Sequence, residues 1–277
     1  MNFFTAPEIA SNYVQTGINK TSYPVWKTLL LGAFSGMVIA CAAATSNTAV
    51  HDILNVGMAR MITGLLFSFG LGIIIVMGSE LFTGSCLNFI PVLEGKITAV
   101  TMLKNWLYVY IGNFIGSLVT AAGCAFFGQL NYSANSLAAF TIKVAAAKCA
   151  ITFPGGFVLG FFCNVLVCAG VLMALSAHDT PGRIMGAYLP VALFVICGFE
   201  HCVANMYYIP AGIFAMQVPA YAAKAAEMGI DSSMLTWGNF LCRHLIPVTL
   251  GNIAGGTSLA AMMWVCHLRK PHSTFSK

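Results

Sequence analysis

The stretch at 196–205, ICGFEHCVAN, places a carboxylate, Glu200, next to an imidazole, His201, between two apolar runs. A carboxylate can exchange protons or cap a helix, and histidine can donate a hydrogen bond and changes charge near neutral pH. The pair could therefore transfer protons, contact a small anion, or only satisfy backbone groups. The elements that carry the pair decide among these roles.

The composition indicates what kind of elements these are. Charged residues make up 8% of the 277 and hydrophobic residues 58%, with a mean hydropathy of +0.83, whereas soluble domains carry roughly a quarter charged residues. A membrane-spanning helix needs about 20 mostly apolar residues. The sequence therefore predicts an all-α integral membrane protein with six transmembrane helices. They are expected at 28–46, 61–93, 106–128, 155–176, 184–216 and 237–266.

The ends of the chain indicate how it sits in the membrane. An even number of spans puts both termini on one side, and the Lys and Arg residues favour the cytoplasmic side. No cleavage pattern follows the first span, so we expect it to be retained. We predict a cytoplasmic segment at 1–25, which could form an amphipathic helix on the membrane surface, a transmembrane domain at 26–268 and a cytoplasmic tail at 269–277. The expected location is the inner (cytoplasmic) membrane.

The two halves of the chain repeat each other. GSELFTG at 78–84 matches GFEHCVA at 198–204, and KNWLYVYIGNFIG at 104–116 matches RHLIPVTLGNIAG at 243–255. Each half holds three spans, so the copies must be inverted relative to each other in the membrane. The middle span of each half carries a glycine and a glutamate in mid-run, which predicts that helices 2 and 5 are broken. Inverted repeats with broken helices point to a transport pathway near the bilayer midplane.

Glu80 and Glu200 occupy the same position in the repeat and are the acidic residues that fall within the spans. A charge there costs about 2.5–3.5 kcal/mol on insertion scales, so it is kept for a partner or a pathway. A broken helix leaves N–H groups without partners, and a carboxylate can accept them. We expect both glutamates to cap the helix breaks. Direct proton transfer is the alternative.

His201 has no ionisable counterpart, because the other half has Leu81 at that position. The symmetry of the fold does not require an imidazole there, which favours contact or proton exchange with a small anion. A core histidine bonded to a backbone carbonyl is the structural alternative. A metal site with Cys197 and Cys202 lacks the ligand spacing of zinc motifs, and most of the ten cysteines fall in apolar runs, as small buried residues do.

Other classes of function lack support in the sequence. It has no phosphate-binding glycine loop and no nucleophile elbow, so we expect neither an enzyme nor an ATP-driven pump, and no cofactor. The net charge of +5 is spread over loops and tails without a basic run, so no nucleic-acid partner is expected. Lys148, just before the fourth span, would on position alone reach lipid headgroups.

Several long motifs resemble the formate-nitrite transporter family of prokaryotic anion channels over about residues 25–268. These motifs are GSELFTG, KNWLYVYIGN, FFCNVLVC, LPVALFVICGFEHCVANMYYIP and IPVTLGNIAGG. The resemblance implies a homopentamer of six-helix protomers. It also implies an aquaporin-like protomer fold with helices 2 and 5 broken, and one pore through each protomer.

The resemblance also assigns roles to residues. It places His201 at the centre of the pore with Thr83 and Asn164 as neighbours, and it moves Lys148 from the headgroups to the substrate pathway, together with Asn205. Lys148 would attract anions, and His201 would replace lost hydration by donating a hydrogen bond. Hydrophobic constrictions are implied at Phe67, Leu71, Leu81 and Phe194.

We therefore predict a passive or gated channel for small monovalent anions of weak acids in a lipid bilayer. The segments ELFTGSC and KCAITF resemble the hydrosulfide branch, which places hydrosulfide first and formate and nitrite next. The alternative is a formate or nitrite transporter with proton coupling, in which the anion borrows a proton in the pore. A membrane metal or redox protein and a water or neutral-solute channel are the competing classes.

Overall fold

The computed structural model describes residues 3–269 of the 277, so the predicted tail lies outside the described residues except for Arg269. Helices make up the regular structure of this range, apart from one isolated bridge between Phe3 and Ala177. The predicted all-α class is confirmed.

Six helical segments are long and apolar enough to cross a membrane, which confirms the predicted number. They are α2 (Val25–Val50), α3 with α4 (Val56–Phe67 and Phe69–Val76), α7 (Ala99–Phe126), α9 (Phe153–Ser176), α10 (Thr180–Cys197) and η3 with α13 (Asn239–Leu245 and Ile246–His267). The shorter helices are α1 (Ala6–Thr21), α5 (Phe82–Ser85), η1 (Cys86–Asn88), α6 (Phe89–Leu93), η2 (Gln129–Asn131), α8 (Ser136–Cys149), α11 (Cys202–Ala215) and α12 (Pro219–Glu227).

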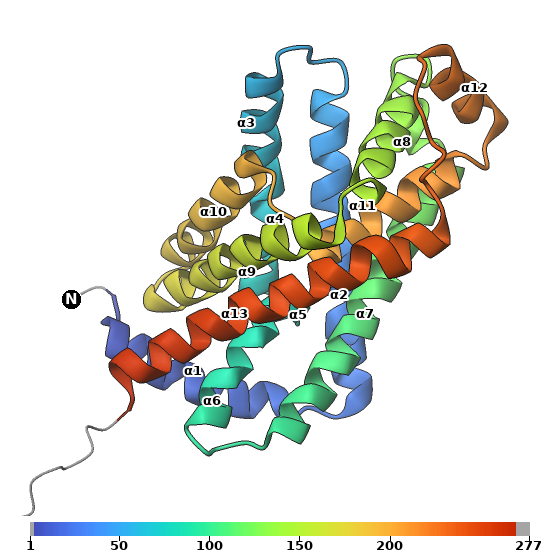
Figure 1. Ribbon diagram of the computed structural model, residues 1–277. Coiled ribbons are helices and arrows are strands. Elements are labelled where there is room, and N and C mark those ends of the chain that lie inside the picture. The colour runs from blue at the N-terminus through green and yellow to red at the C-terminus, as the bar shows by residue number, and fades with distance from the viewer. Residues whose placement is uncertain (1–2, 270–277) are drawn as a thin grey trace, which may run out of the picture.

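The two halves use matching helix pairs. α2 packs along α7, α9 packs along α13, and α3 and α4 both pack against α10; Figure 1 shows α9 and α13 crossing the molecule together. Glycine lets the backbones of each pair approach, because a Cβ on Gly116 would collide with the carbonyl of Ala33, and one on Gly255 with that of Phe161. The predicted repeat of three spans plus three spans is confirmed.

Both predicted breaks are present, at the same position of the repeat. α4 ends at Val76 and the helix resumes with α5 at Phe82, whereas α10 ends at Cys197 and α11 begins at Cys202. Gly78 and Gly198 have φ values of +64° and +76°, in the left-handed region that glycine enters without the penalty of a Cβ. One glycine in each half thus ends the first half-helix.

An asparagine from a neighbouring helix satisfies the first break. The Oδ1 atom of Asn113, on α7, accepts the backbone N–H of Phe82 at 2.9 Å. Its Nδ2 donates to the carbonyl of Gly32 on α2 at 2.8 Å and to the carbonyl of Glu80 at 3.0 Å. One buried amide therefore joins three separate segments and supplies the partners that the interrupted helix lacks.

The second break is satisfied in the same way by Asn252 on α13. Its Oδ1 accepts the backbone N–H of Cys202 at 2.9 Å, and its Nδ2 donates to the carbonyls of Gly160 at 2.8 Å and Glu200 at 2.9 Å. Asn113 and Asn252 are the asparagines of the Gly-Asn pair that the two halves share. The repeated motif is thus the capping device of the fold.

This geometry corrects the prediction that Glu80 and Glu200 cap the breaks. Their carboxylates are paired with the ammonium groups of Lys20 and Lys148, at 3.1 Å and 2.8 Å. The physical reason is charge: a buried carboxylate is best compensated by a full opposite charge, whereas a neutral amide serves backbone groups at no such cost. Each glutamate contributes only its backbone carbonyl to the asparagine cap.

The N-terminal segment forms the predicted helix, α1, but its buried face packs on protein. Tyr13 is 1% exposed, and its hydroxyl lies 3.2 Å from the carbonyl of Gly84 and 3.3 Å from Oδ1 of Asn88. Gly17 fits closely against Pro91 of α6. In Figure 1 α1 lies across one end of the bundle, beside α6 and α13.

The start and the end of the described chain lie at the same end of the bundle. α1 contacts α13, and the backbone N–H of Phe4 donates to the carbonyl of Ser176, the last residue of α9, at 2.8 Å. α8 and α12 lie at the opposite end (Figure 1). The even number of spans predicted this arrangement.

Candidate functional site

The two helix breaks bring His201 and Thr83 together inside the protein. The Nε2 atom of His201 lies 3.0 Å from the Oγ1 atom of Thr83, although 118 positions separate the two residues. His201 is 3% exposed and Thr83 is fully buried. This contact joins the two halves of the repeat at the predicted central pair.

The surroundings of His201 determine which of its nitrogens carries a proton. Its Nδ1 accepts the backbone N–H of Ala204 at 3.1 Å, so the imidazole caps α11. A nitrogen that accepts cannot itself carry a proton, so the neutral ring has its hydrogen on Nε2. The Nε2–H of His201 therefore points toward the hydroxyl of Thr83.

Aromatic side chains cover this polar centre. The ring of Phe194, on α10, stacks on the imidazole of His201 with centroids 5.8 Å apart, and Phe67 meets Phe194 edge to face at 6.1 Å. Leu71 and Leu81 are also buried, and each of the four predicted constriction residues is at most 4% exposed. The hydrogen-bonding groups thus lie in a mostly apolar surround.

Asn164 lies next to Thr83, and its amide donates to backbone carbonyls. Its Nδ2 atom donates to the carbonyl of Thr83 at 3.2 Å and to the carbonyl of Asn252 at 2.7 Å. The thiol of Cys168 also donates to the carbonyl of Thr83, at 3.4 Å. Asn164 therefore positions the backbone of α5 and keeps no free N–H for a ligand.

A charged cluster lies beside the second break. The ammonium of Lys148 donates to both carboxylate oxygens of Glu200, at 3.0 Å and 2.8 Å, and Nδ2 of Asn205 donates to Oε2 at 2.7 Å. Nε2 of His244 lies 3.6 Å from the same oxygen. The side chain of Lys148 is 18% exposed and that of Glu200 is 6% exposed. Lys148 is therefore the member of this ion pair that is more accessible to solvent.

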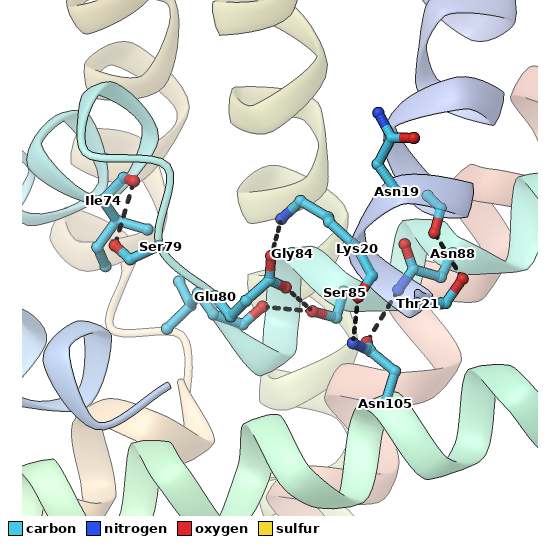
Figure 2. A network of polar contacts seen from close by, with 12 residues as sticks. Asn19, Lys20, Thr21, Ile74, Ser79, Glu80, Gly84, Ser85, Asn88 and Asn105 are labelled. Atoms are coloured by element: carbon cyan, nitrogen blue, oxygen red, sulfur yellow. Dashed lines mark hydrogen bonds and ion pairs between the residues drawn. The ribbon is translucent and has the colours of Figure 1, made fainter. Parts of the chain in front are cut away.

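A matching cluster lies beside the first break, shown in Figure 2. The ammonium of Lys20, at the end of α1, lies 3.1 Å from Oε1 of Glu80, and the hydroxyl of Ser85 donates to Oε2 at 3.5 Å. The side chain of Lys20 is 24% exposed and that of Glu80 only 1%. Each half of the repeat thus places one partly exposed lysine against one buried glutamate.

The structure brings most of the predicted site residues into one connected region. Lys148 forms an ion pair with Glu200, and its role in a substrate pathway stays a prediction. Asn205 belongs to the Glu200 cluster, where its amide nitrogen bonds to Glu200 and His244 and not to His201. The predicted alternative of a core histidine bonded to a backbone carbonyl is not what the described residues show, since the partners of His201 are a hydroxyl and a backbone N–H.

Sequence reasoning missed several residues of the two clusters. Lys20 was assigned to a surface segment, although a lysine shortly before a proline also precedes the fourth span, at Lys148 and Pro154. His244 was aligned with Asn105 in the repeat but given no role. Comparing the segments before the first and fourth spans would have pointed to Lys20, and the match of the third span with the sixth already set His244 against Asn105.

The competing prediction of a metal or redox protein has no donor set in the described range. Among residues 3–269 no group of three His, Cys, Asp or Glu side chains lies close enough to hold a metal ion. The nearby cysteines Cys163, Cys168 and Cys202 are buried as free thiols, in agreement with the prediction of small buried residues.

Comparisons with known proteins agree with this architecture. Residues 7–266 match the family model described as formate/nitrite transporter. The chain is 38% identical to formate channel FocA of Haemophilus influenzae over 219 residues, 78% of this chain and 76% of that protein. It is 34% identical to FocA of Escherichia coli K12 over 264 residues, 92% of each chain.

Two solved structures have the same fold. A pentameric formate channel with formate bound is 34% identical, with a TM-score of 0.76 over 88% of this chain and 98% of that one. An ion channel of the FNT family, 24% identical, has a TM-score of 0.72 over 94% and 98% of the two chains. These proteins are channels, which agrees with the prediction of a transport protein and not an enzyme. The match extends over nearly the whole chain, broken helices and polar centre included, so this chain belongs to the formate/nitrite transporter family.

Proposed function

We propose that this protein is a channel for formate, with one pore through each protomer of a homopentamer. The names of the similar proteins support formate over the hydrosulfide that the sequence motifs placed first. Nitrite and hydrosulfide become the competing permeants, because both are small monovalent anions and the polar centre distinguishes them only by hydrogen bonding. No element for driving transport by ATP is expected from the sequence, so we favour a passive channel, with proton-coupled transport of formate as the alternative.

The observation that carries this proposal is the polar centre formed by His201 and Thr83. A small anion that enters an apolar passage loses its hydration shell, and fixed donors must replace it. The N–H of His201 and the hydroxyl of Thr83 lie 3.0 Å apart, so both can reach the same carboxylate. Phe194 and Phe67 close the space around them and make it costly for hydrated metal ions to pass.

His201 acts as a hydrogen-bond donor in this proposal and not as a source of protons. The Nδ1 atom is occupied by the N–H of Ala204, so the ring could hold a second proton only by giving up the cap of α11. Donation from a neutral imidazole would leave an imidazolate, which is far outside the ordinary range of histidine chemistry. The alternative of proton-coupled transport therefore needs another proton donor, or solvent.

The two lysine–glutamate pairs serve as the entrances. Each pair is neutral as a whole, so the buried carboxylate does not repel an approaching anion, while the partly exposed ammonium group can rotate toward it. Lys148 would act at one end of the pathway and Lys20 at the other, which extends the predicted role of Lys148 to both halves. Ammonium groups in low-dielectric vestibules raise the local concentration of anions.

Anion flux in purified proteoliposomes tests the proposal. We expect formate to cross faster than chloride, nitrite and hydrosulfide at a pH high enough to keep formate ionised, and protein-free liposomes supply the background. Transport of hydrosulfide without formate would overturn the choice of substrate. Osmotic water flow without anion flux would support a water channel instead.

The orientation and the assembly are separate parts of this proposal. We place the protein in the cytoplasmic membrane with both termini in the cytoplasm, on the basis of the Lys and Arg distribution. A fluorescent or protease-sensitive tag at the C-terminus would lie inside intact cells; accessibility from outside would contradict this orientation.

Native mass spectrometry of the detergent-solubilised protein should give the mass of five copies, and a monomer with full activity would remove the pentamer from the proposal.

A further inference from the structure

A cluster of polar side chains at the α8 end of the bundle has no role in the proposed function. His51 and Asp52 lie in the turn between α2 and α3, which Figure 1 shows at the same end of the molecule as α8. Ser133 lies in the connection between α7 and α8, which joins the two halves. Nε2 of His51 lies 2.8 Å from Oγ of Ser133 and 3.1 Å from Oδ2 of Asp52, and those two oxygens are 2.9 Å apart. Three side-chain atoms therefore form a compact triangle between two loops.

The triangle has fewer protons than close contacts. Nδ1 of His51 lies 2.8 Å from the carbonyl of Thr48. A carbonyl can only accept, so the neutral ring carries its hydrogen on Nδ1, and Nε2 presents a lone pair. The ionised carboxylate of Asp52 also only accepts, and the single hydroxyl proton of Ser133 can serve one neighbour at a time. A cation between Nε2 and the carboxylate would stabilise their approach, and it could be a second proton on the ring or a metal ion.

The triangle has the dimensions of one face of an octahedral metal site. Two neighbouring ligands of an octahedral ion with bonds of about 2.1 Å lie about 3.0 Å apart, close to the three observed distances. Imidazole and carboxylate are ligands that first-row transition metals bind. The carbonyl of Thr48 holds the other ring nitrogen of His51, as the outer partners of metal-binding histidines do. An ion just above the triangle would complete its coordination with water.

The cluster is accessible to ions and carries negative charge. The side chain of Asp52 is 62% exposed and that of His51 is 10% exposed, while Ser133 is exposed. With a neutral imidazole the cluster has a charge of −1, because no lysine or arginine within residues 3–269 forms an ion pair with Asp52. A divalent cation can therefore reach the triangle from solvent and gain from the carboxylate.

The backbone holds Ser133 in place before any ion binds. The φ values of the residues at 133–135 are 54°, 50° and 69°, in the left-handed region that residues other than glycine seldom adopt. Such a conformation persists where the surrounding contacts impose it. Gln129, in η2, donates to Oγ1 of Thr48 at 2.9 Å and so ties this connection to the end of α2. The hydroxyl of Ser133 is thus positioned opposite His51 by the fold.

We propose that His51, Asp52 and Ser133 form a binding site for a divalent first-row transition-metal ion. The ion joins the turn of the first half to the connection between the halves, and it stabilises the folded state because it binds only when both segments are in place. This site is separate from the metal or redox class considered for His201 and the cysteines. No group of three His, Cys, Asp or Glu side chains within residues 3–269 could hold a metal; here a serine hydroxyl supplies the third ligand.

Isothermal titration calorimetry of the full-length protein in detergent, purified with a tag that lacks histidine, tests the proposal with Ni²⁺. At about pH 8, where an ordinary histidine is neutral, we expect about one ion per protomer, a micromolar dissociation constant and a higher thermal unfolding temperature. Mg²⁺ and Ca²⁺ prefer oxygen ligands and should not bind at these concentrations. Asp52→Asn keeps the shape of the side chain and should weaken Ni²⁺ binding about tenfold or more. Ser133→Ala should weaken it less, because water can replace the hydroxyl.

A spectroscopic signature and a control variant assign the ion to this site. Electron paramagnetic resonance of the Cu²⁺-loaded protein should show coupling to an imidazole nitrogen, which His51→Gln should remove. Asp231→Asn removes another carboxylate, which accepts the backbone N–H of Ser233 at 2.9 Å, and should leave binding unchanged.

Two results would overturn the inference. Absence of saturable Ni²⁺ binding in the wild type would show that a proton on His51 is the cation of this cluster. Equal binding by the wild type and Asp52→Asn would place the ion elsewhere; Asp52 is exposed, so this variant covers the case in which His51→Gln does not fold. The measurements do not involve anion flux, so the inference and the proposed function fail or stand separately.

Discussion

The two halves of this protein share one backbone plan but carry different side chains at several matching positions. Gly78 and Gly198 end the first half-helices, and Asn113 and Asn252 satisfy the resumed ones with the same three kinds of hydrogen bond. The polar side chains differ, because Leu81 in the first half corresponds to His201 in the second. The comparison separates residues that build the breaks from residues that a permeating anion would contact.

The difference extends to the entrances. Both have a lysine paired with a buried glutamate, but Lys20 comes from a helix on the end of the bundle and Lys148 from α8. Ser85 assists Glu80 where Asn205 assists Glu200. The two halves thus share the charge pair and differ in the side chain that assists it, so the proposed entrances can be compared directly.

Removing the capping amides tests the shared part of the plan and should have the largest effect. Asn113→Ala and Asn252→Ala each remove the side-chain partner of two buried backbone groups at a break, the N–H of Phe82 or Cys202 and the carbonyl of Glu80 or Glu200, at about 1–3 kcal/mol per group. We expect both variants to lose most of their folded protein in fluorescence-detected size-exclusion chromatography. Asn12→Ala, on the exposed face of α1, is the matched control. Normal folding of one of the two variants would show that the halves do not depend equally on their caps.

Making the second half resemble the first should strongly reduce transport. His201→Leu copies Leu81 and removes both the N–H donor and the cap of Ala204. A hydrogen bond to a charged group contributes about 1.5–3 kcal/mol, so formate flux at fixed pH should fall about tenfold or more.

A companion pair of variants sharpens this result. Thr83→Val copies the residue at 203 in the other half and should lower flux less, because His201 still donates. His201→Asn supplies both a helix cap and N–H donors, so it should retain more flux than His201→Leu. Unchanged flux in His201→Leu would remove His201 from the pathway.

The entrances can be compared by removing one lysine at a time. Lys148→Gln and Lys20→Gln each leave a buried carboxylate unpaired at one end of the pathway. Formate flux should fall about tenfold at low ionic strength and less in high salt, because screening weakens attraction of the anion. Flux measured in both directions shows whether the two ends contribute equally. Lys224→Gln, which breaks only an exposed pair with Glu227 at 2.8 Å, controls for the loss of charge; an equal loss of flux there would argue against specific entrances.

The glycines of the breaks should show the smallest effect. Alanine in the left-handed region costs about 1–2 kcal/mol, so Gly78→Ala and Gly198→Ala should both lower the thermal unfolding temperature by a few degrees. Gly198→Ala should be the more affected, since its Cβ would lie 2.9 Å from Nη1 of Arg60, whereas nothing lies within 4 Å of one on Gly78. The reverse order, measured in detergent by thermal shift, would contradict the geometry of the second break.

The sequence was sufficient for the elements and for the repeat. Long apolar stretches predict spans because hydrocarbon excludes polar side chains, and the predicted fifth span at 184–216 becomes α10 and α11 with the break where the glycine and glutamate stand. The match of GSELFTG with GFEHCVA predicted that Glu80 and Glu200 share one structural role. Only the partner was wrong, because the choice between a backbone N–H and an ammonium depends on which segment lies opposite.

Residues that meet across the molecule were the hardest to predict. Lys20 lies 60 positions before Glu80 and reaches it only because Tyr13 and Gly17 dock α1 on α5 and α6. Asn113 and Asn252 were visible as repeated residues, but a repeat does not say what an amide contacts. His244 was visible only as a mismatch with Asn105.

The sequence by itself determined that this chain crosses a membrane six times, that its halves are inverted copies with two broken helices, and that His201 breaks the symmetry between them. These properties follow from hydropathy, from the count of spans and from residue identity, which are local. The tertiary structure alone decided that lysines neutralise the glutamates, that asparagines cap the breaks, and that His201 presents its N–H to Thr83. Those outcomes depend on which groups meet at hydrogen-bonding distance after folding, when each buried polar atom takes the best partner within reach.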